Sequence, residues 1–189
     1  MYQPKLKGMA IAYIGLGANI PSPLGPPERT LSAAAETLGR IGRVVSRSRL
    51  YSTEPVGFAE QPRFVNAVVA LETAWEPRKL LEGLLAIERE SGRDRTYAIP
   101  NGPRTLDLDI LLYGQLVLHE PEIEPRLEVP HPRLAERAFV LVPLCEIAPE
   151  TIVPGLNRRV KELLESLNAN AAQETDAVIA LDSNLWTGA

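Results

Sequence analysis

The sequence predicts an α+β fold in which helices pack on an antiparallel sheet. Strand and helix patterns follow one another in the order strand, helix, strand, strand, helix, strand along residues 9–113. The 189 residues, 45% of them hydrophobic, are enough for one substantial core. We therefore expect a single domain over residues 1–167, followed by a C-terminal tail at 168–189.

The first half of the chain predicts two strands with a helix between them. Residues 9–16 are apolar and β-branched, as in a buried strand. A proline-rich loop then opens a helix from about Glu28 to Leu38, and Gly39 is placed to end it. Residues 41–51 alternate loosely between apolar and polar side chains, which predicts a second strand. The loop that follows, 52–63, has the length at which loops of compact domains are often functional.

The second half begins with the strongest strand pattern, residues 64–73. Pro77 stands at the first position of an expected helix that ends near Ser91, since proline is tolerated in the first helical turn. An irregular Arg-rich stretch, 93–104, leads into residues 105–113, which alternate like a strand. This order of elements is the split β-α-β pattern of ferredoxin-like folds.

Two further helices are expected beyond this sheet. Residues 130–147 predict a turn and a helix, and residues 158–167 predict a last helix on the core. The tail is rich in Ala, Asn and Thr, which favours partial disorder, although Ala177 to Leu181 could add an edge strand.

Composition excludes several classes of function. The net charge of −4, the pI near 5.3 and an aromatic content of only 5% argue against a nucleic-acid partner. The single cysteine, Cys145, cannot form an internal disulfide or build a zinc site alone, which fits a reducing cytoplasm. No apolar run approaches the roughly 20 residues that span a bilayer, and no signal sequence is recognisable, so we expect a cytoplasmic protein without a membrane partner.

Asp107 and Asp109 carry the strongest chemical signal. Residues two apart in a strand project to the same face, so both carboxylates can point at one spot. Carboxylates are the usual ligands of magnesium, and two ions about 4 Å apart can clamp both oxygens of a phosphoryl transfer. The alternative is a polar strand face open to water. Because Asp has poor β propensity, two of them in an otherwise apolar strand favour the metal site.

Basic residues flank this strand. Arg93, Arg95 and Arg104 suit a triphosphate beside paired metals, although a charged, solvated loop paired with neighbouring carboxylates is the simpler alternative. His131 lies in a stiff proline turn, where it could contact a phosphate or a ribose.

Common nucleotide-binding and hydrolase motifs are missing. Gly15 and Gly17 follow a strand, but Ile20 occupies the place of the third glycine of a dinucleotide-binding turn. Neither a P-loop nor a Gly-x-Ser-x-Gly segment occurs, so any ATP site is of another kind and covalent hydrolase chemistry is unsupported.

Residues 102–114, Gly-Pro-Arg-Thr-Leu-Asp-Leu-Asp-Ile-Leu-Leu-Tyr-Gly, resemble the hallmark of the 6-hydroxymethyl-7,8-dihydropterin pyrophosphokinases. The resemblance implies a folate-pathway enzyme that transfers diphosphate from ATP to a pterin alcohol and releases AMP, with two magnesium ions. It covers residues 10–167, and three other blocks agree in order and spacing: Ala12 to Asn19; Tyr51 to Gly57 with Gln61 to Ala67; and Val129 to Leu134 with Glu136 to Phe139.

The resemblance also assigns roles to residues. Asp107 and Asp109 would hold the two magnesium ions, and Phe64 and Phe139 would sandwich the pterin. The arginines that meet the phosphates would be Arg93, Arg95 and Arg104. The ATP site would further contain Leu81, Leu85, Glu88, Ile110, Arg126, His131 and Arg137. The polar edge of the pterin would be read by Asn66, Asp107 and the backbone around Thr53, Glu54 and Val56.

Two positions depart from the family pattern. Asn101 stands where an aromatic residue is frequent, in a loop that is one residue longer, and Phe64 stands where many members carry tyrosine. We expect the loops at 52–63 and 93–101 to close over the substrates, because glycines lie at or near their edges.

Two other classes of function stay open at this point. Nucleotidyltransferases also use an Asp-x-Asp pair with two magnesium ions, but they usually carry a Gly-Ser dipeptide before it, and this sequence has none. A ferredoxin-like regulatory module would leave the aspartates and arginines unexplained. We expect the protein to be a monomer.

Overall fold

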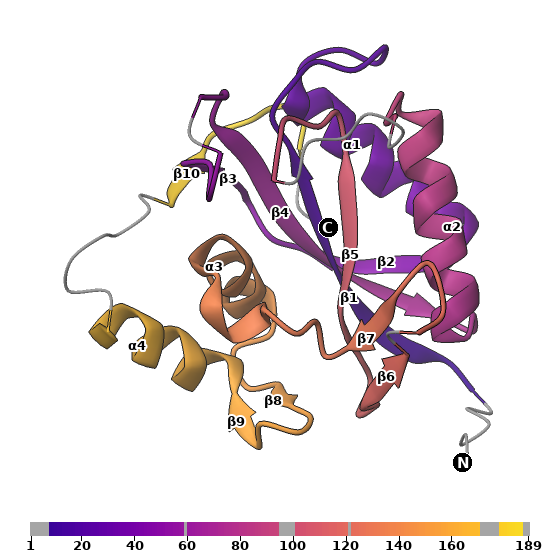
Figure 1. Cartoon of the computed structure of the whole chain (residues 1–189), viewed down its shortest axis with the longest axis vertical. Helices are drawn as coiled ribbons and strands as arrows, with labels where there is room; N and C mark the ends of the chain where they lie inside the picture. Colours follow the sequence, from indigo (N-terminus) through magenta and orange to yellow (C-terminus); the bar gives the residue numbers. More distant parts are fainter. Residues whose placement is uncertain (1–7, 59, 95–100, 121, 171–177, 187–189) are drawn as a thin grey trace.

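The computed structural model describes residues 8–58, 60–94, 101–120, 122–170 and 178–186. A six-stranded sheet forms its centre (Figure 1). Its strands are β1 (Ala10–Ala18), β2 (Arg43–Arg47), β3 (Leu50–Thr53), β4 (Phe64–Thr73), β5 (Asp107–Tyr113) and β10 (Ile179–Leu181).

The strands follow the order β10-β3-β4-β1-β5, and β2 also pairs with β4. Each of these pairings is antiparallel. Placing β1 between β4 and β5 is what the split β-α-β pattern requires, because each helical crossover skips one strand. The predicted fold class is therefore confirmed.

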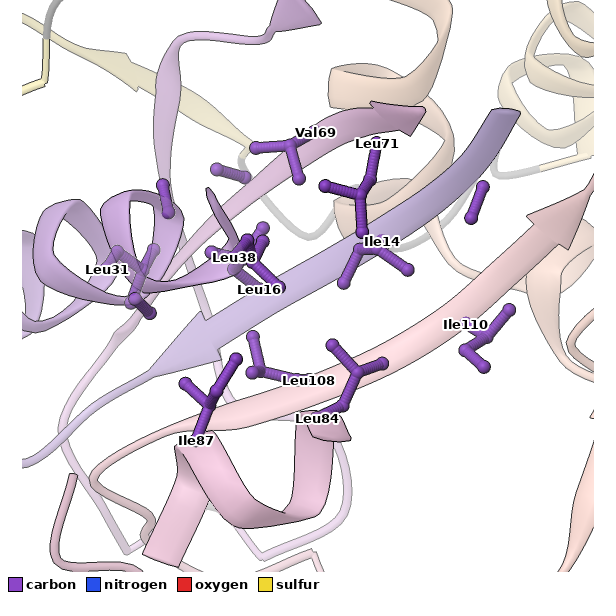
Figure 2. Close-up of a cluster of buried hydrophobic side chains, with 14 of the residues drawn as sticks. Ile14, Leu16, Leu31, Leu38, Val69, Leu71, Leu84, Ile87, Leu108 and Ile110 are labelled. Atoms are coloured by element: carbon purple, nitrogen blue, oxygen red, sulfur yellow. The ribbon is translucent and has the colours of Figure 1, made fainter. Parts of the chain in front are cut away.

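Two helices cover one face of the sheet. They are α1 (Pro27–Thr37), which continues into the short 3-10 helix η1 (Leu38–Arg40), and α2 (Pro77–Glu90). Proline occupies the first turn of both helices, as predicted for Pro77. Leucines of α1 and α2 pack against alternate residues of β1, β4 and β5, and Figure 2 shows Leu31, Leu84 and Leu108 within this cluster.

The opposite face carries a second core. The 3-10 helix η2 (Leu134–Glu136) leads into α3 (Ala138–Ile147), and α4 (Val160–Asn170) packs beside it. Side chains of these helices bury Val68 of β4 and Leu111 of β5. In Figure 1, α3 and α4 lie on the side of the sheet away from α1 and α2.

One expected strand is split in two. Residues 41–51 form β2 and β3, which pair with successive parts of β4 on the same side. Ser48 lies between them, where its hydroxyl accepts the Val68 amide at 3.0 Å and its own amide donates to the Val68 carbonyl at 2.9 Å. A side chain thus replaces a backbone acceptor in the ladder, and the strand is interrupted there between Arg47 and Leu50.

Two small hairpins were not predicted: β6 (Leu118–Glu120) pairs with β7 (Leu127–Val129), and β8 (Ile152–Val153) pairs with β9 (Arg158–Arg159). Their strands have only two or three residues, too few for a period to be read. The expected edge strand is present as β10, although Ala177 lies outside the described residues. Among the residues described, no helix is long and apolar enough to cross a membrane.

Candidate active site

A cleft opens on the α3 face of the sheet, where β1, β3, β4 and β5 meet the start of α3. Its floor comes from the strands and its walls from the segments that follow β3, precede β5 and precede α3. The lining residues are Gly15, Leu16, Gly17, Thr53, Glu54, Val56, Phe64, Asn66, Ala67, Val68, Asn101, Arg104, Asp107, Asp109, Leu111, Arg133, Arg137, Phe139 and Val140.

One end of the cleft is charged. Asp107 and Asp109 lie on the same side of β5, because Leu108 between them points into the opposite core. Asp107 accepts hydrogen bonds from Nη1 of Arg93 and from Nη1 of Arg104, each at 2.6 Å. These two guanidinium groups hold the Asp107 carboxylate in place from two sides.

Asp109 lies two residues further along β5, on the same side of the strand. Its burial, and next the nearby negative charge of Asp107, raise its pKa to about 7. Burial lowers the pKa of Arg137, and so does the neighbouring positive charge of Arg133. Like charges are therefore crowded on both sides of the cleft, which favours a bound cation beside the carboxylates and a bound anion beside the guanidinium groups.

The donor set fits magnesium. The described part of the chain contains no cluster of three or more His, Cys, Asp or Glu side chains that could hold a metal ion, so a site complete in protein ligands is not found there. Magnesium commonly takes one or two protein carboxylates and completes its octahedron with waters and substrate phosphates. Asp107 and Asp109 supply two carboxylates of this kind on one strand face.

The other end of the cleft is aromatic. Phe64, at the start of β4, and Phe139, in the first turn of α3, both line it. Arg104 lies over the Phe64 ring at 5.4 Å from its centroid, and Arg137 lies over Phe139 at 5.4 Å. The two arginines therefore join the charged end to the aromatic end.

Polar groups beside the two rings are fixed in position. Asn66 donates from Nδ2 to Oγ1 of Thr53 at 2.8 Å, which fixes the orientation of its amide. Gly17 lies directly beside it, and a Cβ built on Gly17 would come within 2.9 Å of the Asn66 Oδ1 atom. This close approach explains why position 17 carries glycine, since any side chain there would collide with Asn66.

A family model described as 7,8-dihydro-6-hydroxymethylpterin-pyrophosphokinase (HPPK) matches residues 13–149. The chain belongs to the HPPK family. Curated relatives named 2-amino-4-hydroxy-6-hydroxymethyldihydropteridine pyrophosphokinase agree. The protein of Pseudomonas aeruginosa is 46% identical over 154 residues, which are 80% of this chain and 88% of the relative. The protein of Methylorubrum extorquens is 42% identical over 171 residues, which are 89% of this chain and 100% of the relative.

Solved structures support the fold. The Plasmodium falciparum HPPK-DHPS with STZ-DHP, a triple mutant, matches with a TM-score of 0.68 at 13% identity. The match covers 89% of this chain and 45% of that longer chain. At this level of identity the likeness concerns the fold alone, and the STZ-DHP of that structure is not assigned to this chain.

The pterin-site residues expected from the HPPK resemblance lie together. The structure brings all seven of them into the one cleft: Thr53, Glu54, Val56, Phe64, Asn66, Asp107 and Phe139. Glu54 also forms an ion pair with Arg63, which ties the loop after β3 to the residue before β4.

The expected ATP-site residues are more dispersed. Arg104 and Arg137 line the cleft, and Arg93 reaches it through Asp107. Glu88 is buried, where its Oε1 accepts the Leu108 amide at 2.8 Å and its Oε2 lies 3.7 Å from Nε of Arg93. It thereby helps position both β5 and an arginine.

Four further expected ATP residues do not line this cleft: Leu81, Leu85, Ile110 and Arg126. The Ile110 side chain is 5% exposed and belongs to the core with α1 and α2, while Leu81 packs against that same core. Arg126 is exposed and pairs with Glu124. Leu85 is partly buried on α2, and Arg95 lies outside the described residues.

His131 lies in a closed turn near the charged end. Its amide donates to the Leu111 carbonyl at 2.9 Å, and its Nδ1 accepts the Arg133 amide at 3.1 Å. Burial, and next the charge of Arg137, lower its pKa to about 4. The imidazole is therefore neutral at pH 7, and because Nδ1 is an acceptor its proton is on Nε2.

Sequence reasoning gave no role to two amide side chains, Asn19 and Gln61, that join the loops beside the cleft. Buried Asn19 donates to Oε1 of Gln61 at 2.9 Å and accepts the Arg104 amide at 2.8 Å. Gln61 in turn donates to the Asn101 carbonyl at 2.8 Å. Asn19 and Gln61 occur in the sequence blocks that match the HPPK pattern, but spacing alone could not show that they join three separate loops. Arg133 was missed in the same way, although the Val-Pro-His-Pro-Arg block contains it.

Proposed function

We propose that this chain transfers diphosphate from ATP to 6-hydroxymethyl-7,8-dihydropterin, giving the pterin diphosphate and AMP, a step of folate biosynthesis. One observation carries the proposal: a single cleft is lined by a pair of carboxylates, by several arginines and by two phenylalanines. Membership of the HPPK family and the names of its curated relatives point to the same reaction.

The aromatic end suits the pterin. A flat heterocycle gains dispersion and stacking energy between the faces of Phe64 and Phe139. Its amide-like rim needs directional partners, which Asn66 and the Thr53 hydroxyl supply in fixed orientation. Val56 and Glu54 add the backbone groups of the segment after β3. The aromatic end thus selects the pterin by both shape and hydrogen bonding.

The charged end suits the triphosphate. Two magnesium ions held by Asp107 and Asp109 would neutralise phosphate charge and lower the pKa of the pterin's hydroxymethyl group. Arg93 and Arg104 hold Asp107 before substrate arrives and can turn to phosphate oxygens once a cation shares that carboxylate. Arg137 lies between both ends and can contact the diphosphate during transfer.

The reaction then proceeds by displacement at the middle phosphorus of ATP. The hydroxymethyl oxygen forms a bond to the β-phosphorus, the bond from that phosphorus to the oxygen bridging to the α-phosphate breaks, and AMP leaves. The alcohol's proton is released to solvent or to a phosphate oxygen. The arginines stabilise the charge that moves onto the bridging oxygen. His131, neutral with its proton on Nε2, can donate a hydrogen bond there.

The nucleotide beyond its phosphates would lie against the segment where α2 and β5 meet. Glu88 and Ile110 would act through the backbone that they position, whereas Leu81 and Leu85 would line the adenine pocket. Arg95 and Arg126 complete the proposed ATP contacts. We further propose that the chain works as a monomer and that the domain at residues 1–167 supplies all the groups that contact the substrates.

Product analysis tests this function. A reaction with ATP, magnesium and 6-hydroxymethyl-7,8-dihydropterin should give AMP and pterin diphosphate one for one. ADP or free pyrophosphate as the main product would contradict the assignment and favour another transferase or a hydrolase. The exposed Glu36 of α1 offers a matched control, since Glu36→Gln should leave the yield unchanged while Asp107→Asn abolishes most of it.

A thermal-shift experiment separates the enzyme from a regulatory module. We expect a nonhydrolysable ATP analogue to stabilise the chain far more when magnesium is present, because the metal joins the phosphates to the aspartates. Equal stabilisation with and without magnesium would favour a module that binds nucleotide without chemistry.

A further inference from the structure

The C-terminal segment 178–186 lies along the outer edge of β3, beyond the residues that the HPPK family model matches. We call it the C-terminal strap. Its strand β10 pairs antiparallel with β3, with Ile179 opposite Ser52 and Leu181 opposite Leu50. Figure 1 shows β10 at the end of the sheet, far along the chain from its partner. The strap therefore covers an edge that β3 would otherwise expose.

Trp186 anchors the strap. Its side chain is buried, 6% exposed, in the same core that contains Leu50. The indole Nε1 donates to the Ser48 carbonyl at 2.6 Å, and the Arg47 guanidinium lies 5.5 Å from the ring centroid. Ser48 lies in the break between the end of β2 at Arg47 and the start of β3 at Leu50. The tryptophan thus fixes the corner from which β3 starts.

The other end of β3 belongs to the pterin end of the cleft. The strand has four residues and ends at Thr53, whose hydroxyl accepts the Asn66 amide at 2.8 Å. Glu54 and Val56 follow directly and line the cleft. A strand this short has few ladder bonds to β4, so its position depends on what holds its other edge.

A second attachment of β3 acts in another direction. The Tyr51 hydroxyl donates to Oε2 of Glu146 at 2.8 Å, which joins the face of the strand to α3. That bond sets the separation between sheet and helix. Glu146 also accepts the Arg49 amide at 3.0 Å, and Arg63 donates to the Ser52 hydroxyl at 2.8 Å. The contacts of β10 and Trp186 differ from these because they hold β3 along its outer edge, in the plane of the sheet.

We propose that the C-terminal strap is a positioning element for the pterin site. By holding the outer edge and the starting corner of β3, it keeps Thr53 and the backbone of Glu54 in register with Asn66. This inference rests on the proposed function, because it assumes that the cleft between Phe64 and Phe139 binds the pterin.

Reciprocity provides the first test. If the strap favours the pterin-binding arrangement of β3, bound pterin must in turn stabilise the strap, even though the pterin and the strap are not in contact. Hydrogen exchange would be compared in wild-type protein saturated with magnesium and a nonhydrolysable ATP analogue, with and without 6-hydroxymethyl-7,8-dihydropterin. We expect slower exchange at residues 179–181 when the pterin is added. Slower exchange around Thr53 with no change in the strap would overturn the proposal.

Substitution of the anchor provides the second test. Trp186→Ala should raise the dissociation constant of the pterin by about fivefold or more, the lower end of typical coupling between sites, and leave that of the ATP analogue unchanged. Trp186→Phe keeps an aromatic ring but loses the bond to Ser48, so its effect should be smaller. Leu185→Ala is the matched control, because Leu185 is 52% exposed in the same strap.

The outcomes separate the two proposals. Equal weakening of both ligands in Trp186→Phe, or of neither, would mean that the strap only stabilises the fold, and the inference would fail. If Trp186→Ala does not fold, Trp186→Phe and the exchange experiment still decide. Failure of the wild-type chain to bind the pterin would instead overturn the proposed function, and with it the strap's proposed role.

Discussion

The two faces of β5 share one backbone, but one face packs in the core and the other lines the cleft. On one face, Leu108 and Ile110 belong to the core that α1 and α2 cover, and Figure 2 shows Leu108 near Leu84 and Ile87 of α2. On the other face, Asp107 and Asp109 open into the cleft. Because side chains alternate along a strand, a single seven-residue element contributes to the core and to the proposed metal site at once. Changes on the first face should therefore alter stability, and changes on the second should alter activity.

The division between the core face and the cleft face is incomplete at the start of β5. Glu88 of α2 is buried on the core side, yet it accepts the Leu108 amide and lies beside Arg93, which holds Asp107. A buried carboxylate needs such partners to offset its desolvation. Glu88 is thus a structural residue whose loss would also disturb the charged end of the cleft.

Removing a charge from the cleft face should have the largest effect. Asp107→Asn and Asp109→Asn keep the shape of the side chain but weaken its hold on magnesium, and turnover should fall by at least about a hundredfold. Steady-state AMP release measures this, with unfolding curves as the check that the fold is intact. Near-normal turnover in both variants would remove the metal pair from the mechanism.

Asp109 should also make the free energy of unfolding depend on pH. Its burial, with Asp107 as the second cause, raises its pKa from 3.8 to about 7. Between these pH values the folded chain keeps a proton that the unfolded chain releases, so ionising Asp109 lowers the free energy of unfolding as the pH rises. The amide that replaces this carboxyl in Asp109→Asn cannot ionise. In EDTA, Asp109→Asn should therefore gain stability relative to wild type from pH 4 to 8, by up to about 4 kcal/mol.

Urea unfolding at several pH values measures this difference. Comparison with wild type cancels the opposite contribution of His131, whose lowered pKa makes stability rise over pH 4 to 6.5. A difference that does not vary with pH would show that Asp109 is solvated and ordinary. Such a result would weaken the claim that its environment is prepared for a cation.

The contrast between the faces was largely predictable from sequence. Strand β4 has the bounds that its pattern predicted, and alternation alone placed Asp107 and Asp109 on one side of β5. Such patterns are local and repeat at a fixed period. The family resemblance, rather than periodicity, supplied the pterin residues that the cleft now contains.

The contacts that sequence missed join segments far apart in the chain. Trp186 bonds to Ser48 across 138 positions, and Asn19 meets Gln61 across 42. Neither residue stands in a repeating pattern, and each acquires its role from a tertiary neighbour. The break between β2 and β3 at Ser48 was hidden for the same reason, because it depends on Val68 of another strand.

Removing an aromatic ring from the cleft should have a moderate effect on the KM for the pterin. Phe64→Leu removes a ring from the pterin end, and aromatic contacts of this kind contribute about 0.5 to 1.5 kcal/mol beyond buried area. The KM for the pterin should then rise roughly two- to tenfold, with that for ATP little changed. Phe64→Tyr is the matched control because it keeps the ring. A larger effect on ATP than on pterin would reverse the assignment of the two ends.

The smallest effect is expected on the core face. Ile110→Val removes one methylene from a side chain that is 5% exposed among the leucines of the core, and such changes cost about 0.5 to 1.5 kcal/mol of stability. The KM for ATP should stay within about twofold of wild type if Ile110 meets the nucleotide only through its backbone. Unfolding curves and steady-state kinetics on the same preparation measure both quantities. A severalfold rise in the KM for ATP at unchanged stability would place the Ile110 side chain in the nucleotide site, and the two faces of β5 would then share the substrate.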